Sequence, residues 1–209
     1  AAEFIKTDNI PLVTNGPFTL LKSIGQRKLE LKKYFTEQEL KKVFINSKSQ
    51  QASADKKAKN IFVIVLESFG AENVGFLSGK KTRTPFLDDL MSRSLVFTNA
   101  YADARRSNQA LVAMLASLPS LMNDPFMHSA YAGNRILGLG SLLQKQAYST
   151  NFFNGSQKGL LAWNEFIHAA GMENYISREQ YNNDEDFDGR WGIYDDRFFE
   201  FAAKHPIHE

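Results

Sequence analysis

The sequence predicts an α/β fold in which helices sandwich a mostly parallel sheet, preceded by a short helical linker region. Two observations lead to this prediction. Residues 61–66 are β-branched, aromatic or leucine residues without a polar interruption, which is typical of a strand covered on both faces. From there on, strand-like segments alternate with helix-like segments in the βα manner. The predicted organisation is a helical linker over residues 1–58 and an α/β domain over residues 59–209.

The first predicted strand ends abruptly in polar residues, with Glu67 and Ser68 directly after Leu66. In open α/β sheets, ligands bind at the carboxyl ends of the strands. Glu67 is therefore a candidate site residue. An ordinary polar turn after a buried strand is the alternative, and this segment alone leaves it open.

A second strand is predicted over residues 94–101, and a helix rich in apolar residues follows it. Arg105, Arg106 and Ser107 lie between them, so Ser107 falls just before or in the first turn of that helix. The unpaired N–H groups and positive dipole end of a helix favour an anion there. The alternative is that Ser107 is a plain N-cap and both arginines are solvated.

The remaining elements are predicted from local signals. Residues 17–24 form one short helix, Thr36 caps another with an acidic first turn, and residues 46–59 form a polar linker. Thr84 and Pro85 begin a helix that runs through residue 92. Later elements are a helix at 140–146, a strand at 147–153, a turn at 154–157, and helices at 160–170 and 195–204. The predicted buried side chains of these last two helices are Trp163, Phe166, Ile167, Phe198, Phe199 and Phe201.

Composition agrees with a globular protein, because 43% of the 209 residues are hydrophobic and 12% are aromatic. The net charge of +2 is too small to indicate nucleic-acid binding. Since the sequence has no cysteine, disulfides, cysteine zinc sites and a cysteine nucleophile are excluded.

No segment reaches the roughly 18 consecutive apolar residues that a membrane helix needs. The sequence begins with Ala1 rather than methionine, so we expect it to be the soluble part of a longer protein.

Several short segments, taken in order and spacing, resemble the catalytic domain of the lipoteichoic-acid synthase and phosphoglycerol transferase group. This group is a sulfatase-like branch of the alkaline phosphatase superfamily, and the resemblance covers residues 60 to about 191. The segments are 64–69, 84–88, 97–101, 105–107, 116–121 and 186–192.

The resemblance implies roles for individual residues. Glu67 matches an acidic metal ligand, and Ser107 falls where the family places a hydroxyl nucleophile, usually threonine. A rival register places Arg106 opposite the nucleophile, but a guanidinium cannot attack phosphorus. The implied substrate-binding residues are Arg105, Arg106, Asp186, Arg190 and Trp191. For Trp191, a place in the hydrophobic core is the alternative.

The implied cofactor is a divalent metal ion, with Mn²⁺ preferred and Mg²⁺, Ca²⁺ or Zn²⁺ possible, held by Glu67 and Ser107. Such a cation activates a hydroxyl and neutralises charge on phosphoryl oxygens. The expected partners are a lipid-linked phosphoglycerol donor and a glycan or glycolipid acceptor, with no nucleic acid. The resemblance also implies a location at the cell membrane of a bacterium, facing the periplasm or the exterior.

Two alternatives stay open beside the transferase. One is a sulfatase or phosphodiesterase, in which water accepts the group, although residues 107–111 lack the proline and arginine of formylglycine sulfatases. The other is a non-catalytic binding module. Because the family places an Asp-His pair and another histidine farther downstream, we expect this chain by itself to be inactive and to bind metal weakly.

Overall fold

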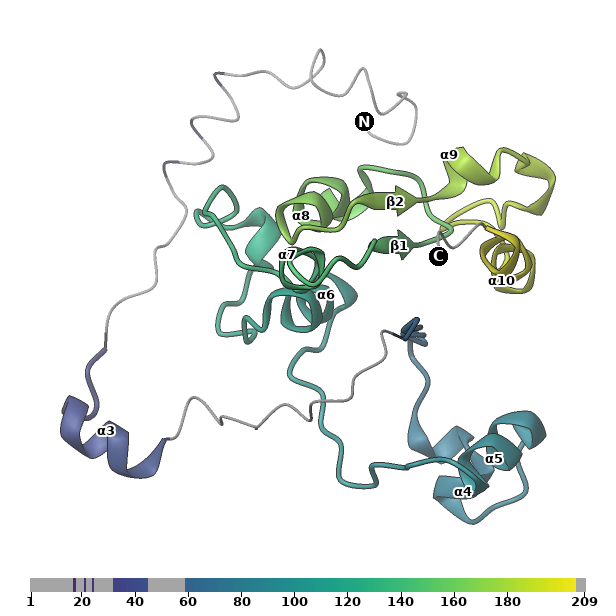
Figure 1. The fold of residues 1–209 in the computed structure, drawn as a ribbon, viewed down its shortest axis with the longest axis horizontal. Helices are drawn as coiled ribbons and strands as arrows, with labels where there is room; N and C mark the ends of the chain where they lie inside the picture. The colour runs from purple at the N-terminus through teal and green to yellow at the C-terminus, as the bar shows by residue number, and fades with distance from the viewer. Residues whose placement is uncertain (1–16, 18–20, 22–23, 25–31, 45–58, 206–209) are drawn as a thin grey trace. The chain divides into compact units, whose positions relative to one another are not determined.

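The computed structural model describes residues 17, 21, 24, 32–44 and 59–205 of the chain (Figure 1). The chain forms two compact units, of which one is Leu29–Ala100 and the other is built on Tyr101–Glu209. Most of the predicted helix at 17–24 and of the polar linker at 46–59 lies outside the described residues. No helix of the described ranges combines the length and the apolar composition needed to cross a membrane.

In the first unit, helix α3 (Glu37–Val43) begins where the sequence predicts a helix. The Thr36 hydroxyl accepts a hydrogen bond from the Glu39 N–H, and the Glu39 carboxylate accepts one from the Thr36 N–H at 2.9 Å. This reciprocal capping box satisfies two N–H groups that a helix start leaves unpaired. The local sequence is therefore sufficient to set this boundary.

The rest of the first unit contains the short 3₁₀ helix η3 (Ala71–Asn73) and the helices α4 (Gly75–Ser78) and α5 (Pro85–Ser92). Side chains of α5 and of its N-cap hold α4 in place. The Asp88 carboxylate accepts a hydrogen bond from the Phe76 N–H at 2.8 Å, and the Thr84 hydroxyl accepts one from the Gly75 N–H at 3.2 Å. The predicted helix after Thr84 is thus confirmed.

Two predicted strands are absent from the described part of the chain. Residues 61–66 and 94–101 are not in strand conformation, and all their large apolar side chains except that of Val96 are exposed, as for Val63 at 75% and Leu95 at 82%. A strand requires a neighbouring strand to pair its N–H and C=O groups, and local residue preference cannot supply that neighbour. The prediction of strands at these positions is therefore wrong for this structure.

The second unit contains a two-stranded parallel sheet of β1 (Asn151–Phe153) and β2 (Asn174–Ile176). Asn151 pairs with Asn174, and Phe153 pairs with Ile176. The strand predicted at 147–153 is confirmed in its last part. The described residues are mostly helical, so the predicted mostly parallel sheet is reduced to this one parallel pair.

Helices α6 (Ser107–Ala116), α7 (Leu139–Gln144) and α8 (Trp163–Ala169), with η4 (Phe126–His128) and η5 (Leu160–Ala162), form the larger part of this unit. Figure 1 shows α6, α7 and α8 on the side of the sheet where β1 and β2 begin. The core joins Leu111 and Val112 of α6 to Phe166 and Ile167 of α8. The predicted burial of Phe166 and Ile167 is confirmed, and Trp163 packs partly buried against the same cluster.

Beyond the carboxyl ends of the strands lie α9 (Arg178–Tyr181) and α10 (Asp195–Lys204), connected through η6 (Asp184–Asp186) (Figure 1). Phe198 of α10 is buried, and its ring packs with those of Tyr181 and Phe201. Phe199 is 48% exposed, so its predicted burial is wrong. One position after Phe198, its side chain lies about 100° farther round the helix and leaves the packed face.

Candidate functional site

Ser107 is the first residue of α6, and the N-cap position is held by Arg106, whose side chain makes no capping hydrogen bond. The interpretation of Ser107 as a plain N-cap is therefore wrong. Its side chain is half-buried at the positive end of a ten-residue helix. Leu111 and Val112 anchor that helix in the core, so packing determines where the helix lies in the second unit.

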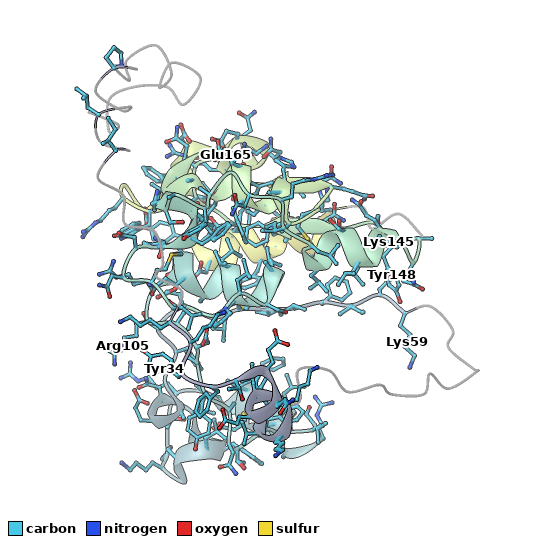
Figure 2. All side chains as sticks on the ribbon, turned by 90° about the vertical axis from the view of Figure 1, so that its left-hand side faces the viewer. Tyr34, Lys59, Arg105, Lys145, Tyr148 and Glu165 are labelled. Carbon is cyan, nitrogen blue, oxygen red and sulfur yellow. The ribbon has the colours of Figure 1, made fainter. Side chains whose placement is uncertain are left out.

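Arg105 and Arg106 are exposed beside this helix end, and Figure 2 shows Arg105 at the surface of the protein. Within the described ranges, neither arginine forms an ion pair. Asp103 acts just upstream, where its carboxylate accepts a hydrogen bond from the Ser120 N–H at 2.8 Å. This bond ties the segment before α6 to the segment after it. Two guanidinium groups and a helix N-terminus together favour a bound anion.

Glu67 is exposed in the first unit, and its carboxylate accepts a hydrogen bond from the Ser68 hydroxyl at 3.1 Å. Because Ser107 belongs to the second unit, the expectation that Glu67 and Ser107 together hold the metal ion stays a prediction. The described residues include no group of three histidine, aspartate or glutamate side chains able to hold a metal ion. A hard divalent cation takes about six oxygen ligands, so these residues by themselves do not assemble its site.

The loop that carries Arg190 and Trp191 is organised by Asp188. One oxygen of the Asp188 carboxylate accepts hydrogen bonds from the N–H groups of Arg190 at 2.8 Å, Trp191 at 2.7 Å and Gly192 at 3.1 Å. The bond from the Arg190 N–H is the largest of the causes that hold the pKa of Asp188 below its ordinary value, and burial opposes the shift. The carboxylate is therefore held in its charged form.

The same loop docks on the turn that follows β1. The Ile193 N–H donates to the Gly155 carbonyl at 2.9 Å, and Gly192 forms an antiparallel bridge with Ser156. The carboxyl ends of parallel strands are the usual position of ligand sites in α/β sheets. The structure thus brings the Trp191 loop to the carboxyl end of the parallel pair.

Trp191 is 58% exposed, so the interpretation of this residue as part of the core is wrong. The Arg190 guanidinium lies over the Trp191 ring, 5.3 Å from its centre. Asp186 is turned to the protein instead, because its carboxylate accepts hydrogen bonds from the Tyr181 hydroxyl at 2.5 Å and the Asn183 amide at 3.1 Å. The predicted substrate contact of Asp186 stays a prediction.

Sequence reasoning missed a polar network behind this loop. The Ser156 hydroxyl and N–H both donate to the Asn154 side-chain oxygen, and the buried Ser177 hydroxyl donates to Glu179 at 2.6 Å. Burial raises the pKa of Tyr175 to about 12, the Ser156 hydroxyl opposes this rise, and the charge of Glu179 adds to it. The sequence signal that could have indicated this network is that Asn154 and Ser177 each directly follow a strand.

Substitution of Gly192 by alanine is expected to detach the loop from the turn. A Cβ atom at this position would lie 2.6 Å from the Gly155 carbonyl oxygen, which is backbone and cannot rotate away. We expect the resonance of the Trp191 indole N–H to move in Gly192→Ala. Gly189→Ala is not a neutral control because Gly189 has a φ of 82°. Ala203→Gly, at an exposed position in the last turn of α10, serves as the control. An unchanged Trp191 resonance in Gly192→Ala would contradict the docking.

Comparisons with known proteins identify the family and the fold of this chain. The model of the sulfatase family matches residues 59–205, more than half of the chain. A protein in the alkaline phosphatase superfamily from Vibrio parahaemolyticus is similar at 27% identity with a TM-score of 0.58, over 65% of this chain and 33% of that one. The lipoteichoic acid synthase LtaP from Listeria monocytogenes shares the fold at 20% identity with a TM-score of 0.52, over 58% and 29%. The chain spans about a third of the length of these two structures.

Proposed function

Because the chain belongs to the sulfatase family, within the alkaline phosphatase superfamily, we propose that it is part of a metal-dependent phosphoglycerol transferase. Members of this family are generally enzymes. In its wider form, the proposal allows the transferred group to be a phospho group related to phosphoglycerol. In this proposal Ser107 is the covalent nucleophile, and the reaction takes place outside the cytoplasmic membrane.

The observation that carries the proposal is the position of Ser107. Its hydroxyl is at the first residue of α6, where the helix dipole and the adjacent Arg105 and Arg106 provide positive charge. A phosphodiester approaching this end of the helix meets charge complementary to its own. An arginine at the N-cap is unfavourable next to the positive dipole end unless an anion is bound there.

The proposed reaction has two displacements at phosphorus. In the first, the Ser107 oxygen forms a bond to the phosphorus of the lipid donor while the bond from phosphorus to the lipid alkoxide breaks. The hydroxyl proton of Ser107 is lost, and the departing lipid alkoxide gains a proton. In the second, the oxygen of an acceptor hydroxyl forms a bond to phosphorus while the bond from phosphorus to the Ser107 oxygen breaks. The acceptor hydroxyl loses its proton, and the Ser107 oxygen gains one. Arg105 or Arg106 binds a non-bridging oxygen throughout.

A divalent cation, with Mn²⁺ preferred, belongs to the proposal because sulfatase-superfamily enzymes are typically metal-dependent. Such a cation would lower the pKa of a bound hydroxyl and neutralise phosphoryl charge. Glu67 is the carboxylate that this chain would contribute, as an exposed side chain that accepts a bond from Ser68. The described residues do not complete its coordination, so the chemical steps above are assigned to the hydroxyl and the arginines alone.

The proposed donor is a lipid-linked phosphoglycerol, and the proposed acceptor is a glycan or glycolipid at the bacterial cell membrane. A lipoteichoic acid synthase has the same fold, so this fold can carry a transferase reaction. Residues 107–111 support it further, since they lack the proline and arginine of formylglycine sulfatases.

A substrate panel with the whole protein tests this proposal. We expect release of diacylglycerol from a phosphatidylglycerol donor, and we expect this release to rise when a glycan acceptor is added. Aryl sulfates should remain uncleaved under the same conditions. Cleavage of aryl sulfates with no action on the glycerophosphate diester would replace the transferase by the sulfatase alternative. Release that is independent of any acceptor would instead indicate a phosphodiesterase.

A further inference from the structure

The stretch that precedes α6 is held in place by one of its own side chains. Residues 101–105 belong to no helix or strand, and their N–H and C=O groups form no backbone hydrogen bond within the described part of the chain. The Asp103 carboxylate instead accepts a hydrogen bond from the Ser120 N–H at 2.8 Å. Asp103 therefore connects this stretch to the segment that follows α6.

The segment after α6 runs back along the helix. Its first residue, Ser117, is the C-cap and has a φ of 52° and a ψ of 29°, a left-handed conformation that ends the helix. Farther on, the Gln109 side-chain amide donates to the Met122 carbonyl at 3.5 Å. Because Gln109 lies in the first turn of α6, residues 117–122 lead from the C-terminal end of the helix toward its N-terminal end.

The Asp103 bond requires the stretch before α6 to turn back as well. The ten residues of α6 span about 15 Å. From Ser117 to Ser120 the chain covers at most about 11 Å, so Ser120 lies short of the N-terminal end of the helix. To reach it, residues 103–106 cannot extend away from the helix and must bend. The two arginines stand at this bend, next to Ser107.

The bend holds like charges close together. Arg105 and Arg106 are adjacent to the positive N-terminal end of α6, and within the described ranges neither of them forms an ion pair. Repulsion from the helix end and between the two guanidinium groups favours a stretch that swings away from Ser107. The bond between Asp103 and Ser120 opposes this movement, and hydrogen bonds to a charged acceptor are stronger than neutral ones.

We propose that Asp103 is a positioning residue of the site at Ser107, and that its bond to the Ser120 N–H holds Arg105 and Arg106 where they meet the anionic group of a substrate. This inference rests on the proposed function, because it explains how that site keeps its positive charge in place before a substrate binds. Asp103 itself touches no reacting atom. The rival explanation is that Asp103 acts by its charge alone, in which case it would weaken the binding of an anion.

Two substitutions of Asp103 in the whole protein separate these explanations. Asp103→Ala removes the acceptor, whereas Asp103→Asn removes the charge but keeps an oxygen acceptor. We expect Asp103→Ala to raise the KM for a phosphatidylglycerol donor at least about tenfold with a much smaller change in kcat, because the arginines bind the substrate both before and during the reaction. Asp103→Asn should stay within about threefold of the unmodified protein. An equal fall in KM in both variants would show that charge alone matters and would overturn the proposal.

Ser120→Pro deletes the donor of the same bond. The Leu121 N–H donates to the Pro119 carbonyl at 2.9 Å and Ser120 has no positive φ, so this turn is an inverse γ-turn with a φ of about −75° at Ser120, which proline readily adopts. We expect Ser120→Pro to raise KM as Asp103→Ala does, and the double variant to be no worse than either single one. Asp124→Ala removes an exposed carboxylate four residues beyond Ser120 but leaves the bond in place, so its KM should be unchanged. Additive effects of the two single substitutions would contradict a shared bond.

A distance measurement tests the bend without relying on the reaction. The 209-residue chain has no native cysteine, so spin labels can be attached through Ala102→Cys and Met114→Cys, at exposed positions before α6 and within it. We expect the distance between the labels to lengthen and its distribution to broaden in Asp103→Ala and in Ser120→Pro, but not in Asp103→Asn. Unchanged distances in both Asp103→Ala and Ser120→Pro would overturn the proposal.

These two kinds of measurement separate the inference from the proposed function. A longer distance in Asp103→Ala, combined with no phosphoglycerol transfer by the unmodified protein, would keep Asp103 as the positioning residue and reject the proposed reaction. Transfer by the unmodified protein, with the same KM in Asp103→Ala, would do the reverse.

Discussion

Substitution of Ser107 by alanine in the whole protein is expected to lower phosphoglycerol transfer by at least about 10³-fold. The reason is chemical, since alanine has no oxygen with which to form the covalent intermediate. The substitution should leave the fold intact. Ser107 is the first helical residue rather than the N-cap, and alanine is the best helix former. Release of diacylglycerol from a lipid donor measures the loss, and thermal unfolding measures the stability.

Two further variants serve as controls for this result. Ser107→Thr keeps a hydroxyl, so measurable activity should remain. That outcome would show that the loss in Ser107→Ala comes from the missing oxygen and not from the change in side-chain size. Ser117→Ala removes a serine hydroxyl at the other end of α6, where Ser117 is the C-cap, and should retain transfer. Near-normal activity of Ser107→Ala would assign the nucleophile to another residue.

Truncation of Ile167 is expected to be the most destabilising single change in the second unit. Its side chain is fully buried in the cluster that joins α6 to α8, so Ile167→Ala leaves a cavity in that core. Such substitutions cost about 2–5 kcal/mol of unfolding free energy. Urea unfolding of the chain, followed by circular dichroism, measures the loss.

The matched control for this change is Leu137→Ala. Leu137 is 60% exposed in the same unit, so its truncation should alter the unfolding free energy by less than about 0.5 kcal/mol. Equal effects of the two substitutions would show that the core around α8 is not packed as described.

The sequence predicted the helices better than the sheet. Thr36 with Glu39, and Thr84 with Pro85, fixed helix starts through bonds and ring geometry within one turn of the chain, and both starts were confirmed. The predicted strand at 61–66 had the right composition but no pairing strand in the described residues. Hydrogen-bond partners distant in sequence decide whether such a segment becomes a strand, and residue preference does not contain them.

For the site, the sequence located Ser107 at the start of a buried helix because serine, arginines and apolar residues follow one another directly. The environment of Trp191 was not predictable in the same way. Its exposure depends on Asp188 folding back on the following N–H groups and on the contact between Gly192 and Gly155, which are separated by many residues. The role of Glu67 in a metal site stays a prediction, since it depends on residues from both units.

The most direct test of the proposed mechanism is to trap the covalent intermediate. The whole protein is incubated with a phosphatidylglycerol donor without acceptor, quenched in acid, digested and examined by mass spectrometry. The mechanism predicts a phosphoglycerol group on the peptide that contains Ser107, and its loss after a glycan acceptor is added. A phosphoglycerol group on a different residue, or turnover without any modified peptide, would contradict it.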